Sequence, residues 1–349
     1  MAHGAGPKHP SRGLKAQRQI VILPYRGYGN AEKLVLPGRV LRDERIRPAR
    51  EGERRWRNFV AFVKRLESDE LPYARLRARF RGAERELRAD REGYFRLELP
   101  APSRLEAGWH TVALELAADA SVRTLGRVLV PPANARFGVV SDIDDTVVQT
   151  NVASKVRMLL TVALSNARTR KPFAGVAAFY RALHAGVNPF FYVSKSPWNL
   201  YVPLAEYLDV QRLPEGPLFL RNLGLRMPRD HKCTAIGALL KAYPRLPFIL
   251  IGDSGENDPE VYTDIVRRFP SRIRTIYIRS VNRKPQRLAA IERLIAQVAR
   301  TGCQLVLAPE AEHAAAHAAA EGLIQTSDLR AVCAERKADE RRPSPVHLR

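Results

Sequence analysis

The stretch "FGVVSDIDDTVVQT" (residues 137–150) places three carboxylates within four positions, directly after an apolar run. Carboxylates this close repel one another unless a cation lies among them or a reaction needs them. Asp142 and Asp144, two residues apart at the end of a predicted strand, should point into the same crevice. The stretch therefore predicts either a catalytic pair or an acidic β–α turn, in which Asp145 or Thr146 caps the next helix.

The apolar pattern in the rest of the second half of the chain predicts the kind of sheet to which this strand belongs. Short continuous apolar runs are typical of buried parallel strands, and helical patterns lie between them. This alternation predicts an α/β domain over residues 136–325, with a Rossmann-like doubly wound parallel sheet. Ligands bind such sheets at the carboxyl ends of the strands. Three of the predicted strand ends carry polar or acidic residues, namely Asp142 with Asp144, Ser194, and Asp253.

The first part of the chain has a different pattern. Residues 19–132 show the two-residue alternation of β-strands, separated by turn-rich stretches, whereas residues 54–68 space their apolar side chains as a helix does. We expect a small mainly-β, sandwich-like domain with one helical insertion and no catalytic constellation. The basic residues 1–18 and the charged residues 326–349 are both expected to be disordered.

A formal net charge of +22 over 349 residues allows two explanations. The excess is shared by both halves of the chain, with arginines scattered among acids, which favours a generally arginine-rich composition. The alternative is attraction toward an anionic partner, either a lipid surface or a nucleic acid. We expect no specific nucleic-acid binding.

Cysteine usage and hydropathy bear on the compartment. The three cysteines show no CxxC spacing, so they predict neither a disulfide framework nor a zinc site. No run approaches the roughly 20 apolar residues of a membrane-spanning helix. We therefore expect a cytoplasmic protein, with peripheral membrane contact left open.

A second acidic stretch, "LIGDSGENDPE", ends another apolar strand at Asp253 and adds Asp258 five residues later. Mg²⁺ takes near-octahedral oxygen ligands and keeps several waters, so a few carboxylates from separate loops suffice. We expect Asp142 and Asp253 to supply two ligands and the backbone carbonyl of Asp144 a third. Asp258 is better placed to orient waters or Lys232 than to bind the metal.

The same residues suit phosphoryl transfer. Asp142 could attack phosphorus and form an aspartyl-phosphate, which divides one difficult hydrolysis into two easier steps. Asp144 could protonate the departing alkoxide and then deprotonate the water that cleaves the intermediate.

Two further polar residues fit a phosphate site. Ser194 can offer its hydroxyl to a phosphoryl oxygen, or it can cap the following helix, for which Ser196 is the better candidate. Lys232 opens a predicted helix, where a cation fits the helix dipole poorly, so contact with a carboxylate or phosphate is favoured. His231 has no spaced metal-ligand partner and is predicted to be structural.

The order of "DIDDT", a strand-ending serine, a lysine and "GDSGEND" is similar to that in the haloacid dehalogenase superfamily of phosphohydrolases. A closer resemblance is to the catalytic domain of the actin-patch phosphatidate phosphatase family. It is carried by "FGVVSDIDDTVVQT", "FYVSKSPWNLY" and "HKCTAIGALLKAYPRLPFILIGDSGENDPEVY". The resemblance extends over roughly residues 20–325 and is weaker in the β part, where "LPYRGYGN" and "GRVL" carry it.

The resemblance implies a sheet of the haloacid dehalogenase type and a Mg²⁺-dependent release of phosphate from phosphatidate, leaving diacylglycerol. It assigns Asp142 as nucleophile and Asp144 as general acid and base. Ser194 and Lys232 become phosphate-orienting residues, and the metal is held by Asp142, Asp144 and Asp253.

Three residues depart from the family pattern. Lys195 stands where we expect a small polar residue, Asn222 where we expect an acid, and Glu256 where we expect a neutral amide. None of them is one of the assigned catalytic positions, so they bear on the substrate rather than on the chemistry.

Substrate and class of function stay open at this point. A soluble phosphate ester or a phosphoprotein could use the same mechanism as a lipid phosphate, and a non-catalytic module that binds anionic lipid is the third reading. Residues 154–171 combine apolar and basic side chains, which suits either a membrane interface beside the site or an ordinary helix with one buried face.

Overall fold

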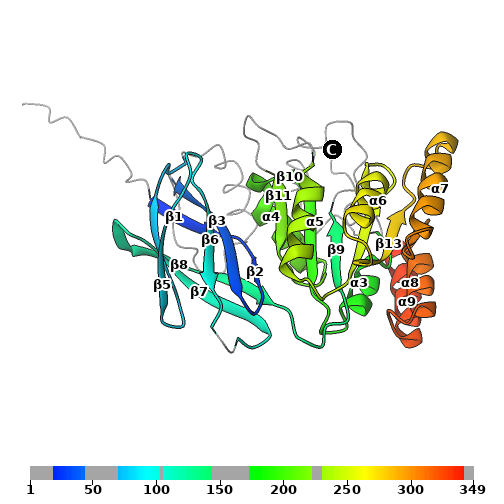
Figure 1. The fold of residues 1–349 in the computed structure, drawn as a ribbon, viewed down its shortest axis with the longest axis horizontal. Helices are drawn as coiled ribbons and strands as arrows, with labels where there is room; N and C mark the ends of the chain where they lie inside the picture. Colours follow the sequence, from blue (N-terminus) through cyan, green and yellow to red (C-terminus); the bar gives the residue numbers. More distant parts are fainter. Residues whose placement is uncertain (1–18, 44–69, 103–104, 144–172, 222–229, 342–349) are drawn as a thin grey trace, which may run out of the picture.

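The computed structural model contains two β-sheets that lie next to each other along the molecule, with helices packed on the second (Figure 1). It is therefore a mixed α/β structure. The segments 54–68 and 154–171, for which we expect helices, lie outside the described residues. The structure describes residues 19–43, 70–102, 105–143, 173–221 and 230–341.

The N-terminal sheet has eight strands in the order β1-β3-β2-β8-β7-β4-β5, with β6 paired to β3. The long strand β3 pairs with β6 along one edge and with β2 and β1 along the other, so hydrogen bonds connect all eight strands. The sandwich-like arrangement stays a prediction. Alternating side chains from most of its strands form a single apolar core. The strands are β1 (Gln19–Pro24), β2 (Gly27–Gly29), β3 (Lys33–Asp43), β4 (Arg75–Phe80), β5 (Ala83–Arg88), β6 (Tyr94–Pro100), β7 (Gly108–Leu116) and β8 (Asp119–Val130).

The second sheet has six strands in the order β11-β10-β9-β12-β13-β14, and every neighbouring pair is parallel. The chain runs outward from β9 through β10 to β11, then crosses to the other side of β9 and continues through β12 and β13 to β14. The predicted parallel α/β sheet is thus confirmed. The strands are β9 (Gly138–Asp142), β10 (Phe190–Pro197), β11 (Leu218–Arg221), β12 (Phe248–Asp253), β13 (Ile273–Arg279) and β14 (Gln304–Ala308).

Helices cover both faces of this sheet, which explains why β9 and β12 are buried along their whole length. No helix within the described ranges is long and apolar enough to cross a membrane. One face packs against α3 (Val176–His184), α4 (Tyr201–Val210), α8 (Ala311–Ala320) and α9 (Thr326–Arg341). The other packs against α5 (His231–Ala242), α6 (Asp258–Arg268) and α7 (Pro285–Ala299).

The end of the chain differs from our expectation. We expected residues 326–349 to be a disordered tail, but residues 326–341 form α9, which packs against α3 and α8. Val332 is fully buried in the core, and Arg336 contacts the carboxylates of Glu310 and Glu312 at 3.2 and 2.9 Å. The high charge of this stretch reflects ion pairs on the outer side of a docked helix rather than disorder.

The short segment that enters β2 joins the two sheets. Tyr25 stacks on Trp198 with ring centroids 4.5 Å apart and an interplanar angle of 8°, while Tyr28 packs into the apolar cluster on the other face of the parallel sheet. The guanidinium of Arg26 donates to both carboxylate oxygens of Asp209 at 2.8 Å. The motif "LPYRGYGN" therefore reaches both faces of the parallel sheet from the N-terminal one.

A second set of contacts supports the segment that follows β10. The buried Arg39 of β3 donates to the side-chain oxygen of Asn199 at 3.1 Å, and the backbone N–H of Arg26 donates to the hydroxyl of Tyr201 at 2.6 Å. Asn199 lies in the short 3₁₀ helix Trp198–Leu200, immediately after β10. The N-terminal sheet thus holds the carboxyl end of β10 in place.

We predict that Tyr25→Ala lowers the free energy of unfolding by about 3 kcal/mol or more, because a large buried aromatic side chain is lost from this junction. Leu125→Ala is the control, since Leu125 is 65% exposed and should change stability by less than about 0.5 kcal/mol. Urea unfolding measures both. Equal, small effects would show that the junction adds nothing to stability.

Candidate active site

Four of the five predicted site residues are described, and the fold gathers them at the carboxyl ends of the central strands. Asp142 ends β9, Asp253 ends β12, and Ser194 lies on β10 one residue past the pair Val193–Asp142. Lys232 begins α5. All four are buried, with exposures of at most 2%. Asp144, like the neighbouring Asp145, lies outside the described residues.

Lys232 is the centre of the site's ion pairs. Its ammonium nitrogen lies 2.8 Å from Oδ1 of Asp142 and 3.4 Å from Oε2 of Glu256, and it also donates to Oδ1 of Asp258. Burial acts to lower the pKa of Lys232, but the carboxylates of Asp142 and Asp258 outweigh it and hold that pKa well above its ordinary value. Lys232 therefore stays charged, and these contacts offset the unfavourable position of a cation at a helix start.

Asp253 lies beside this network with one oxygen satisfied and the other not. Its Oδ1 accepts the backbone N–H groups of Gly255 and Glu256 at 2.6 and 2.9 Å. Its Oδ2 is buried and has no hydrogen-bond partner among the residues that the structure describes. Burial, together with the nearby Asp258, raises the pKa of Asp253 to about 7.

The three aspartates could hold a metal ion. Asp142, Asp253 and Asp258 each offer a carboxylate oxygen, and these oxygens lie within 4.8 Å of one another. A carboxylate that binds a metal ion is expected to have a raised pKa and an oxygen without a hydrogen-bond partner when the ion is absent, and Asp253 shows both among the described residues. Because all the donors are oxygens, the cluster fits a hard divalent cation such as Mg²⁺. Asp258 contacts Lys232, as we predicted, and also joins this cluster.

The structure also bears on the predicted roles of Ser194, Ser196 and His231. The 3₁₀ helix after β10 and α4 both begin without a side-chain capping bond, so neither Ser194 nor Ser196 serves as the expected helix cap. Instead the hydroxyl of Ser194 accepts the backbone N–H of Ser196 at 2.9 Å. His231 is half-buried with a ring nitrogen 3.2 Å from the carbonyl oxygen of Phe219, which fits the structural role we predicted for it.

Two supporting residues have no signal in the sequence. Tyr180 on α3 hydrogen-bonds the hydroxyl of Ser141 at 2.7 Å, and that hydroxyl donates to the backbone carbonyl of Asp142. Arg287 on α7 donates to the backbone carbonyls of Ser254 and Glu256 at 2.8 and 2.6 Å, which fixes the loop after β12. Their roles depend on helices that meet the site only in the folded chain.

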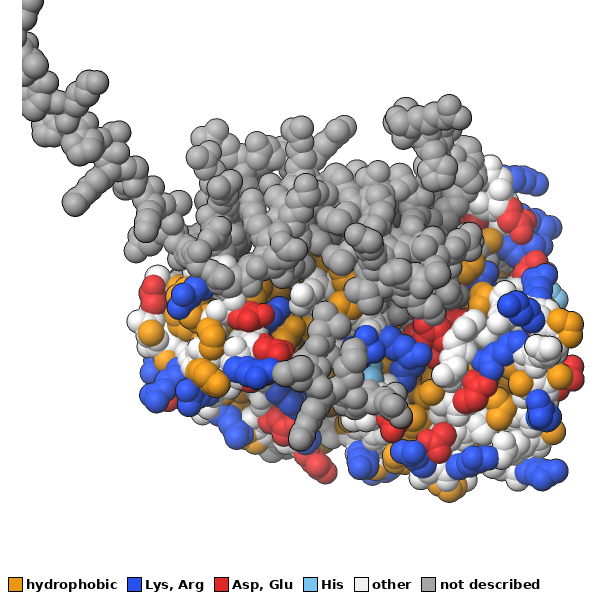
Figure 2. Space-filling model, turned by 90° about the horizontal axis from the view of Figure 1, so that it is seen from above, with side chains coloured by type: hydrophobic (Ala, Val, Ile, Leu, Met, Phe, Trp, Pro, Cys, Tyr) orange, Lys and Arg blue, Asp and Glu red, His pale blue; other side chains and the backbone are white. Residues whose placement is uncertain are grey.

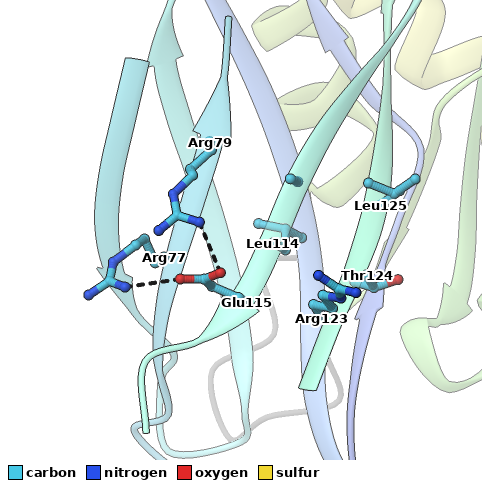
Figure 3. Close-up of a pocket in the computed structure, with 8 residues that line it drawn as sticks. Arg77, Arg79, Leu114, Glu115, Arg123, Thr124 and Leu125 are labelled. Atoms are coloured by element: carbon cyan, nitrogen blue, oxygen red, sulfur yellow. Dashed lines mark hydrogen bonds and ion pairs between the residues drawn. The ribbon is translucent and has the colours of Figure 1, made fainter. Parts of the chain in front are cut away.

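The N-terminal sheet carries a hollow of about 460 Å³ between β4, β7 and β8 (Figure 3). Arg77 and Arg79 line it, but Glu115 accepts from them at 3.0 and 3.1 Å, and Glu84 contacts both guanidinium groups. The positive charge of these two arginines is therefore compensated within the sheet.

One face of the molecule shows a mixture of charges among its described residues. On the face seen in Figure 2, Lys and Arg side chains are interspersed with Asp and Glu. This distribution favours the interpretation that the net charge reflects an arginine-rich composition.

Comparison with known proteins supports the sequence resemblance. Residues 137–280 match the family model described as the catalytic domain of phosphatidate phosphatase APP1. The chain is 36% identical over 152 residues to phosphatidate phosphatase APP1 of Saccharomyces cerevisiae, covering 41% of this chain and 26% of that protein. It is 27% identical over 152 residues to an uncharacterized protein of Schizosaccharomyces pombe, covering 42% and 25%.

These matches cover only part of each protein, since the chain spans about a quarter of the length of the curated relatives it matches. Among solved structures, a carbohydrate acetylesterase from Xanthomonas citri aligns with 79% of this chain and 72% of its own. Its identity is 11% and its TM-score 0.28, which does not establish a common fold.

We predict that Asp253→Asn stabilises the metal-free protein at pH 8 by roughly 1–3 kcal/mol, because it removes a buried charge that faces Asp258. The folded pKa of Asp253, about 7, exceeds its ordinary 3.8, so ionisation destabilises the fold. The advantage of the variant should be complete above about pH 7 and should shrink as the pH falls toward 4. Thermal unfolding across this range measures it.

The same variant should lose the stabilisation that saturating Mg²⁺ gives the wild type, because a metal ligand is missing. Glu292→Gln, which removes an exposed carboxylate on α7, is the control and should change neither measurement. An Asp253→Asn protein that Mg²⁺ stabilises as much as the wild type would exclude Asp253 as a ligand.

Proposed function

We propose that this chain is a phosphatase that converts phosphatidate to diacylglycerol, because residues 137–280 match the family model of the phosphatidate phosphatase APP1 catalytic domain. The observation that carries the proposal is the buried contact of Lys232 with Asp142, 2.8 Å long, beside Oδ2 of Asp253, a buried oxygen without a hydrogen-bond partner among the described residues. A module that only binds anionic lipid would have no use for a buried lysine among buried acids.

The fold is consistent with a phosphohydrolase of the haloacid dehalogenase type. The chain leaves β9 in one direction to β10 and β11 and returns to its other side at β12, so the switch point lies between β9 and β12. Ligand sites of open α/β sheets lie at such points, beyond the carboxyl ends of the strands. Asp142 and Asp253 end these two strands.

In the reaction we propose, a carboxylate oxygen of Asp142 attacks the phosphorus atom of the phosphomonoester. The bond between phosphorus and the ester oxygen breaks, and Asp144 protonates the departing alkoxide to give diacylglycerol. Asp144 then takes a proton from water, the water oxygen attacks the aspartyl-phosphate, and Asp142 and inorganic phosphate are released.

Lys232 and Ser194 orient the phosphoryl group in this scheme. Lys232 stays positively charged, because Asp142 and Asp258 hold its pKa well above its usual value, so it can oppose the negative charge of the phosphate. The hydroxyl of Ser194 lies on the neighbouring strand and can donate to a phosphoryl oxygen while it accepts from Ser196.

Mg²⁺ is the cofactor that we propose for the aspartate cluster. Asp142 and Asp253 would hold it, together with the backbone carbonyl of Asp144, and Asp258 would orient its surroundings through Lys232. Bound there, a divalent cation supplies positive charge against which phosphate and carboxylates can approach one another.

The substrate places the protein at a membrane surface. Phosphatidate is a lipid, so a cytoplasmic enzyme must reach it by peripheral contact, for which the apolar and basic residues 154–171 are our candidate segment. A soluble phosphate ester remains the competing substrate with the same mechanism.

We predict Mg²⁺-dependent release of phosphate from phosphatidate in mixed micelles, abolished by EDTA. Asp142→Asn should reduce the rate by at least about 10³-fold, as loss of a nucleophile does, and Asp119→Asn should leave it unchanged. A small aryl phosphate, assayed in parallel, separates chemistry from substrate. Release from the aryl ester alone would keep the mechanism and exclude the lipid, whereas release from neither by the folded protein would exclude the proposed activity on these esters.

A further inference from the structure

Two of the departures from the family pattern meet in the folded chain. Lys195, on β10 next to Ser194, and Glu256, in the loop after β12, are 61 positions apart in sequence. Their side chains form an ion pair in which Nζ of Lys195 lies 3.0 Å from Oε2 of Glu256. A lysine where a small polar residue is expected thus faces an acid where an amide is expected.

This pair touches the phosphate-orienting lysine. The same oxygen of Glu256, Oε2, lies 3.4 Å from Nζ of Lys232, so one carboxylate oxygen is shared by two ammonium groups. The Glu256 side chain is 3% exposed and that of Lys232 is 2% exposed, whereas that of Lys195 is 41% exposed. Glu256 is therefore a buried charge between an inner and an outer lysine.

The charges of Lys195 and Glu256 matter because they lie next to the proposed phosphate site. A buried carboxylate next to a phosphate site repels the incoming phosphate and attracts the lysine that should orient it. Lys195 adds one positive charge where Glu256 adds one negative charge, so together they leave the net charge of the site unchanged. The distances also favour Lys195 as the closer partner of Glu256, at 3.0 Å against 3.4 Å for Lys232.

We propose that Lys195 and Glu256 act as a compensating pair, in which Lys195 is a positioning residue. It engages the Glu256 carboxylate and so leaves Lys232 available to the phosphoryl group of the substrate. The inference rests on the proposed phosphatase function, but it concerns how this chain's own residues keep the phosphate site competent, whichever ester it hydrolyses.

The test is a double-mutant cycle built from the neutral residue types expected at these positions: Lys195→Ser, Glu256→Gln and the double variant. Lys195→Ser alone should weaken binding of inorganic phosphate and raise KM by about tenfold, which is about 1.4 kcal/mol, with kcat changed much less. Glu256→Gln alone should not weaken phosphate binding. The double variant should return to within about threefold of the wild type, since the uncompensated charge is gone.

Two controls separate positioning from folding. Lys195→Arg keeps the charge and should resemble the wild type, and Lys241→Ser removes another lysine, at the end of α5, and should have no effect. Phosphate affinity is measured by calorimetry with Mg²⁺ present, and KM and kcat with the aryl phosphate. Melting temperatures show that each variant is folded.

Either result decides the inference. The proposal is overturned if Lys195→Ser binds phosphate as tightly as the wild type. It is also overturned if the loss of phosphate affinity in the double variant equals the product of the fold-changes of the two single variants, or if the wild type binds no phosphate. A wild type that binds phosphate but hydrolyses no ester would refute the proposed function alone, because the calorimetric cycle would still test the pair.

Discussion

The buried ammonium group of Lys232 is the interaction on which the site depends. It touches Asp142 at the end of β9, and Glu256 and Asp258 in the stretch that follows β12, and without it three carboxylates would repel one another in a buried place. Removing one member of such a network leaves an uncompensated charge, which is more harmful than never burying the pair. The network therefore ties the start of α5, the end of β9 and the start of α6 into one unit. Beside it, Oδ2 of Asp253 has no hydrogen-bond partner among the described residues.

The N-terminal sheet belongs to this unit through packing rather than chemistry. Tyr25 stacks on Trp198, and Arg39 donates a hydrogen bond to Asn199. The residues that follow Ser194 and Lys195 are therefore fixed by contacts with the N-terminal sheet. Phosphate-orienting groups must be held in one geometry before they can contribute to catalysis, because any freedom they retain has to be lost in the transition state. The N-terminal sheet can contribute to the site in this way.

Several expectations changed once the helices and strands were in place, and each for a local reason. Residues 326–341 look like a disordered tail because half of them are charged, yet Val332 and the ion pairs of Arg336 dock them as a helix. The capping roles of Ser194 and Ser196 were plausible from composition, and the backbone geometry after β10 replaced them with a contact between the two residues.

The sequence by itself determined the parallel sheet and the acids at its strand ends, because buried strands require continuous apolar runs and chemistry places carboxylates where those runs stop. It also placed Ser194 and Lys232 beside them. Only the tertiary structure decided which charges meet. Lys195 and Glu256 stand out in the sequence as departures from the family pattern, but only the folded chain shows that they pair. Tyr180 and Arg287 reach the site from helices whose docking no periodicity encodes. Contacts of this kind follow from strand order and helix packing, which bring together residues that the chain keeps apart.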